Sequence, residues 1–266
     1  MNEHFKPAGH KAQELSEIVL PEETFKPIQR VIDTTIEGED KTIGYLYHDV
    51  EYTPGVIDGF VLSKGVLCDT DRETTYKSTL EWQVYERNDT KNPIKWFVPP
   101  GPIILELCYQ TQHNHSPLAQ EIKASWQKAF NDPRWWMLTS TILQYNDDIT
   151  HVYHDWTTDA GIASVPGEKR LSISDNNSPI ANQFLCTILG KRFSIARQVF
   201  GQYSPLMQLW TPEGNARYKC ALVLGVSNGK FDIGADNDVI YSNGSARGVA
   251  LAKKLLEDKR YEVRDD

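Results

Sequence analysis

The first half of the chain carries the pattern of half-buried strands. Between residues 42 and 109, short runs of aromatic and branched side chains alternate with clusters of Gly, Pro, Asn and Asp, which favour turns. The runs are 43–47, 60–62, 80–85 and 103–107, and the turn clusters are 53–55, 58–59, 87–89 and 99–102. Consecutive strands that are joined by short turns predict an antiparallel meander across this region.

A second pattern, with an apolar side chain at every fourth position, predicts a helix at 117–130. Its apolar face consists of Leu118, Ile122, Trp126 and Phe130. Ser116 stands where an N-cap accepts a backbone hydrogen bond, and Pro117 suits the first helical position. Weaker signals of the same kind predict helices within 22–33, at 178–189, near 194–201 and at 245–258.

The second half of the chain returns to strands. Apolar runs predict them at 135–145, 149–156, 207–210, 218–226 and 231–233, with hairpin turns at 146–148 and 228–229. Residues 157–177 are rich in Gly, Pro, Ser, Asn and Asp, which predicts a long loop. Because the strands come in runs and do not alternate with helices, we expect an α+β fold: mainly antiparallel sheet packed by three to five helices.

The length of 266 residues allows one large domain or two small ones. The sequence contains no internal repeat and no low-complexity linker. We therefore expect a partly ordered segment at 1–20 and a single α+β domain at 21–266. A division into two lobes near 157–177 is the alternative.

The charge balance narrows the choice of partners. Lys and Arg total 28 against 36 Asp and Glu, which gives a net charge of −8. Affinity for nucleic acids rests on neutralising phosphates with Lys and Arg, so a nucleic-acid partner is disfavoured, although a local basic groove is compatible with this balance. No apolar stretch is long enough to span a membrane, and the N-terminus does not resemble a secretory signal.

The cysteines point to a reducing compartment. Cys68, Cys108, Cys186 and Cys220 are far apart and mostly adjoin apolar residues. This spacing lacks the paired ligands of a zinc site and is typical of buried free thiols. The sequence therefore predicts a soluble cytoplasmic protein without disulfides.

Asp69 and Asp71 are the candidate metal ligands. They follow the apolar run 65–67 and are spaced by one residue. Such a pair can hold Mg²⁺ or Mn²⁺ against a diphosphate, because hard cations prefer oxygen ligands. Over three residues the stretch resembles the Asp-x-Asp motif of nucleotide-sugar glycosyltransferases. An acidic turn without a metal is the alternative.

His151, His154 and Asp155 are the candidate catalytic residues. On a helix these three side chains would share one face and could form an acid-base or metal cluster. On a strand, His151 and Asp155 share one face while His154 points to the other. The flanking residues favour a strand, which would separate the two histidines.

Gly244, Ser245, Arg247 and Gly248 are the candidate anion-binding residues. A glycine-rich turn that enters a helix exposes unpaired backbone N–H groups to an anion, and Arg247 would add a positive charge. The turn has a slight resemblance to the Arg-Gly-x-Gly-x-Gly turn of acyl-CoA-dependent N-acetyltransferases, but Ala250 and Ala252 replace the later glycines. A capped helix without a ligand is the alternative.

The sequence alone does not establish a function, and two classes remain. The first, which we favour, is a non-catalytic protein that binds a small molecule or another protein, through an aromatic-lined sheet face or an edge strand. The second is a metal-assisted transferase or hydrolase acting on a phosphorylated metabolite, in which Asp69 and Asp71 hold Mg²⁺ or Mn²⁺ and Arg247 holds phosphate. The second class requires 69–73 and 244–248 to lie across one cleft.

Overall fold

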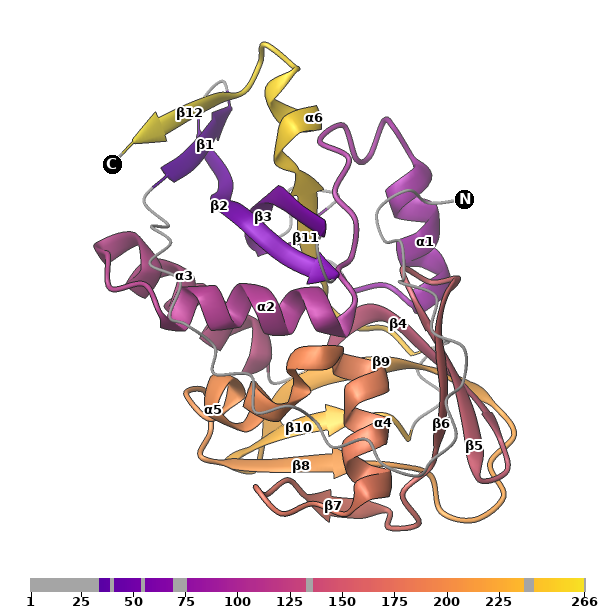
Figure 1. Ribbon diagram of the computed structural model, residues 1–266. Coiled ribbons are helices and arrows are strands. Elements are labelled where there is room, and N and C mark those ends of the chain that lie inside the picture. The colour runs from indigo at the N-terminus through magenta and orange to yellow at the C-terminus, as the bar shows by residue number, and fades with distance from the viewer. Residues whose placement is uncertain are drawn as a thin grey trace.

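The computed structural model describes residues 34–38, 41–53, 56–68, 76–132, 136–236 and 242–265. In this part of the chain, two largely antiparallel sheets and six α-helices form the α+β fold that the sequence predicts (Figure 1). None of these helices is long and apolar enough to cross a bilayer. The expected segment at 1–20 and the expected helix within 22–33 lie outside the described residues.

The smaller sheet has five strands in the order β11-β3-β2-β1-β12, all antiparallel to their neighbours. The strands are β1 (Thr34–Gly38), β2 (Lys41–Thr53), β3 (Val56–Val66), β11 (Arg247–Leu251) and β12 (Glu262–Asp265). The predicted strands 43–47 and 60–62 lie in β2 and β3 and pair with each other, with Tyr45 opposite Leu62. This hairpin confirms the start of the predicted meander.

The larger sheet has seven strands in the order β6-β5-β4-β9-β10-β8-β7. They are β4 (Met137–Asn146), β5 (Ile149–His154), β6 (Thr158–Ser164), β7 (Arg170–Ser172), β8 (Leu206–Trp210), β9 (Lys219–Ser227) and β10 (Lys230–Gly234). Asn228 and Gly229 join β9 to β10 with φ of 49° and 71°, as the predicted hairpin turn requires. β10 runs parallel to β8, and its other neighbour β9 is antiparallel.

The meander prediction is wrong beyond β3, because 80–85 and 103–107 are helical. They lie in α1 (Thr79–Arg87) and α2 (Gly101–Gln112). Ser78 and Glu81 form a capping box that begins α1. Every residue of α2 from its first to its eleventh is buried, including the polar Glu106, Gln110 and Thr111, so burial on all sides leaves no clear helical period in its sequence.

α3 (Pro117–Phe130) and α4 (Pro179–Leu189) confirm the predicted helices at 117–130 and 178–189. Both begin with a Ser-Pro pair. The Ser116 hydroxyl accepts a hydrogen bond from the Ala119 N–H, and the Ser178 hydroxyl accepts one from the Ala181 N–H. Local capping chemistry therefore fixes where these two helices start.

The later part of the chain contains two further corrections. The predicted loop 157–177 contains β6 and β7, the two edge strands of the larger sheet. The predicted helix 245–258 is strand β11 followed by the short helix α6 (Ala252–Leu256). Near 194–201, a 3₁₀ turn (Lys191–Ile195) leads into α5 (Ala196–Phe200).

α2 occupies the centre of the fold, between the two sheets (Figure 1). It contacts β2 of the smaller sheet, β4 of the larger sheet, and the helices α3, α4 and α5. Gly101 allows its first turn to approach α4, since a Cβ there would lie 2.6 Å from the Ile188 carbonyl oxygen. The main apolar core is built around this helix.

Candidate functional site

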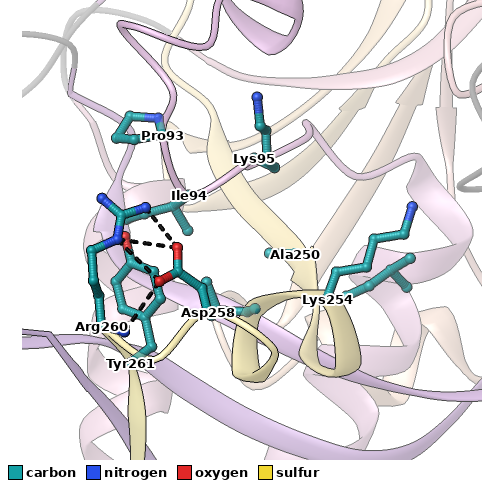
Figure 2. Close-up of a pocket in the computed structure, with 10 residues that line it drawn as sticks. Pro93, Ile94, Lys95, Ala250, Lys254, Asp258, Arg260 and Tyr261 are labelled. Carbon is teal, nitrogen blue, oxygen red and sulfur yellow. Dashed lines mark hydrogen bonds and ion pairs between the residues drawn. The ribbon is translucent and has the colours of Figure 1, made fainter.

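A hollow of about 270 Å³ lies beside α6, and Figure 2 shows the side chains that line it. We call it the α6 cleft; its lining residues are 93–95, 250–251, 254–255, 258 and 260–261. They come from the loop after α1, from β11, from α6 and from the turn that leads to β12. Two segments that are distant in the sequence, 93–95 and 250–261, thus meet at one surface.

The loop after α1 is fixed by a buried asparagine. The Asn92 side chain accepts a hydrogen bond from the Trp96 N–H at 2.8 Å and donates one to the Trp96 carbonyl oxygen at 2.7 Å. Lys95, between them, adopts a left-handed φ of 64°. Two backbone hydrogen bonds of 2.9 Å between Phe97 and Val249 then attach the loop to β11. Lys95 is therefore held at the edge of the cleft.

The opposite edge is fixed by the turn after α6. The Arg260 guanidinium donates hydrogen bonds to both carboxylate oxygens of Asp258, the shortest at 2.6 Å, and lies 5.5 Å from the centre of the Tyr261 ring. The Tyr261 N–H donates to the Asp258 carbonyl oxygen at 3.0 Å. These contacts define the positions of Arg260 and Tyr261 in Figure 2.

The cleft combines an apolar floor with a positively charged rim. Ile94, Ala250 and Leu255 are buried or half-buried and belong to the adjoining core. The rim residues are Lys95, Lys254, Asp258 and Arg260, three cations and one carboxylate. Lys95 pairs with Asp89 outside the cleft, but both side chains are more than half exposed, and such ion pairs contribute little to stability. On a chain with a net charge of −8, the rim of this cleft is a local excess of positive charge. Such an excess attracts anions.

The predicted catalytic residues do not form one cluster. β5 is a strand, as its flanks indicate, and places His151 and His154 on opposite faces. Nδ1 of the buried His154 lies 2.9 Å from the Thr141 hydroxyl, which accepts a hydrogen bond from the Gly101 N–H. Burial lowers the pKa of His154 to about 3, so it is neutral at pH 7. Among the described residues, no group of three His, Cys, Asp or Glu side chains could hold a metal ion.

Asp155 lies near a glutamate that the sequence did not single out. Asp155 and Trp156 occupy the turn between β5 and β6 with left-handed φ of 46° and 66°. Glu86 accepts hydrogen bonds from the Trp156 indole N–H at 2.9 Å and from the Val98 N–H at 2.7 Å. Burial, assisted by the charge of Asp155, raises the pKa of Glu86 to about 8. The hydrogen bond between Trp156 and Glu86 attaches this turn to the end of α1.

The candidate metal ligands Asp69 and Asp71 lie outside the described residues, so their role stays a prediction. The described residues on either side of them both reach the candidate anion site. The Leu67 N–H donates to the Ala246 carbonyl oxygen at 2.7 Å, and Lys77 exchanges two backbone hydrogen bonds with Gly244.

The candidate anion-binding residues are engaged in packing. The expected glycine-rich turn into a helix is extended backbone leading into β11. Ser245 and Arg247 are fully buried. The Arg247 guanidinium lies 4.4 Å from the Trp126 ring centre and donates hydrogen bonds to the Ser125 hydroxyl at 2.8 Å and to the Ser63 carbonyl oxygen. Its role in phosphate binding stays a prediction without an accessible guanidinium to support it.

Gly248 has a packing role that can be tested. A Cβ at Gly248 would lie 2.6 Å from the Leu67 Cδ2 atom and 3.0 Å from the Trp96 Cβ atom. We expect Gly248→Ala to lower the free energy of unfolding by about 1–3 kcal/mol in urea titrations, because it overpacks this contact. Gly65→Ala is the matched control, since nothing lies within 4 Å of the added methyl group. An equal cost for both variants would contradict the packing role.

Comparisons with protein-family models, with curated proteins and with solved structures gave no match to this chain.

Proposed function

We propose that this protein binds a small anionic ligand in the α6 cleft and acts as a binding protein. The observation that carries the proposal is that three cationic side chains, Lys95, Lys254 and Arg260, stand around one apolar floor (Figure 2). The ligand class is a phosphate or carboxylate attached to an apolar body. As part of this proposal we place the protein in the cytoplasm, in keeping with its four free thiols.

Lys254 is the cation best placed to bind the negatively charged group of the ligand. Within the described residues it forms no ion pair, whereas Lys95 and Arg260 each have a carboxylate partner. An ammonium group that is not already paired can bind an anion without first breaking an ion pair. The partners of Lys95 and Arg260 are solvent-exposed or half-buried, so those two side chains can turn to a ligand at small cost.

The proposal is tested by calorimetric titration with phenyl phosphate, which combines a dianion with an apolar ring. We expect it to bind more tightly than inorganic phosphate, which lacks the ring, and than benzyl alcohol, which lacks the charge. Benzoate in a parallel titration distinguishes a carboxylate site from a phosphate site. Binding should weaken as salt is added, because the rim cations are exposed.

Lys254→Gln should weaken phenyl phosphate binding by about tenfold, or about 1.4 kcal/mol. Lys253→Gln is the matched control, because Lys253 is the adjacent exposed lysine of α6 and does not line the cleft. The proposal is wrong if benzyl alcohol binds as tightly as phenyl phosphate, or if both lysine variants weaken binding equally.

A further inference from the structure

A second hollow, of about 340 Å³, lies at the carboxyl ends of β8 and β10. We call it the β8–β10 pocket; its lining residues are 169, 211–213, 215–218 and 236. Because β8 and β10 run parallel, the segments that follow them leave the sheet at the same edge. Both segments therefore contribute residues to one pocket.

The backbone around this pocket is fixed before any ligand binds. The buried Thr211 hydroxyl lies 2.9 Å from the Pro166 carbonyl oxygen and 2.7 Å from the Glu168 carbonyl oxygen. The Tyr218 hydroxyl donates a hydrogen bond to the Asp236 carbonyl oxygen. A pocket that is held in this way loses little conformational entropy when a ligand enters.

Among the described residues that line the pocket, the Asp236 carboxylate has no cation in contact with it. The Arg217 guanidinium donates two hydrogen bonds of 2.9 Å to Asp147, outside the pocket. Lys169 forms a long ion pair, 4.0 Å, with Glu213. Among the described residues, none forms an ion pair with Asp236, which is half-buried. Burial raises the pKa of Asp236, as expected for a carboxylate that lacks full hydration.

We propose that the β8–β10 pocket binds a small organic ammonium compound, with its nitrogen at the Asp236 carboxylate and its carbon skeleton beside the Tyr218 ring. A cation would supply the partner that Asp236 lacks, and the Tyr218 ring offers apolar surface to the carbon skeleton. The volume of the pocket is within the range of small-molecule sites. Lys169, whose charge also acts on Asp236, would compete with the ligand.

Two probes of nearly equal shape test this proposal. We expect isobutylammonium chloride to bind the full chain in an NMR or calorimetric titration, and isobutanol to bind at least tenfold more weakly. Asp236→Asn keeps the size of the side chain and removes its charge, so it should weaken isobutylammonium binding at least tenfold. Lys169→Gln removes the competing cation and should tighten binding.

Asp159→Asn is the matched control, because it removes one carboxylate charge on β6, at the opposite edge of the sheet, and should bind like the unmodified chain. Equal binding of alcohol and ammonium, or unchanged binding by Asp236→Asn, would overturn the proposal. If Asp236→Asn does not fold, the proposal is still tested by the difference between the two probes and by the effect of Lys169→Gln on isobutylammonium binding. Lys254→Gln should leave this binding unchanged, so failure here is distinct from failure at the α6 cleft.

Discussion

Replacing Arg247 by alanine should lower the free energy of unfolding by about 3–5 kcal/mol, because it empties the volume of a large, fully buried side chain. Arg247→Met should cost less, about 1–2 kcal/mol, since methionine refills most of that volume. No described carboxylate pairs with the guanidinium, so its removal leaves no buried charge without a partner. The two variants therefore separate packing from charge.

Urea titrations with both variants measure this difference, provided that the slope of the unfolding free energy is unchanged. Burial lowers the pKa of Arg247 to about 10, so the residue is charged at pH 7 and the comparison is made in one protonation state. If Arg247→Met is as costly as Arg247→Ala, the positive charge itself is required. That result would show that the contacts of the guanidinium with Ser63, Ser125 and Trp126 stabilise the fold more than the volume it fills.

His154 should make the protein sensitive to mild acid. Above pH 6.5 the imidazole is neutral in both the folded and the unfolded chain. Below that pH the unfolded chain takes up a proton, which the folded protein, with a His154 pKa of about 3, does not. Stability is therefore lost as the pH falls from 6.5 toward 3. Between pH 7 and pH 4.5 this group alone should lower the free energy of unfolding by about 2.5 kcal/mol.

His154→Gln should remove this part of the acid sensitivity, which is measured by urea titrations at pH 7 and pH 4.5. His151→Gln is the control and should keep the acid sensitivity of the unmodified protein, because the buried His154 remains. Glu86, whose pKa is raised to about 8, acts in the opposite direction, since its stability contribution is lost as the pH rises from about 4.5 to 8. Only the difference between variant and unmodified protein isolates His154. An unchanged pH dependence in His154→Gln would contradict the prediction.

The elements that the sequence predicted well are those whose signals are local. α3 follows from its own apolar period and from the Ser116 cap, and the β9–β10 hairpin follows from Asn228-Gly229. The elements that were missed obtain their character from distant residues. α2 resembles a strand in sequence because its neighbours bury every side. β11 is a strand because it pairs with β3, which is far away in the chain and which the local sequence does not reveal. In α2, Pro102 just after the first residue was a usable helix signal.

The two ligand sites could be predicted only in part. The pair Lys253-Lys254 is visible in the sequence as the longest basic cluster, but nothing in the sequence brings Lys95 and Arg260 around one apolar floor. Asp236 could have been named as a candidate ligand-binding residue from the sequence, because it follows a predicted strand as Asp69 follows an apolar run. Its burial and its lack of an ion pair depend on tertiary structure, as does the burial of Arg247.

The central position of α2 has a consequence for how the chain can be divided. Strands of both sheets pack on this helix. A truncation that removed either sheet would therefore expose its buried side chains to water. Each fragment would then carry an exposed apolar surface, and its molecules would tend to aggregate. A shortened form of this protein should therefore keep both sheets, because both cover α2.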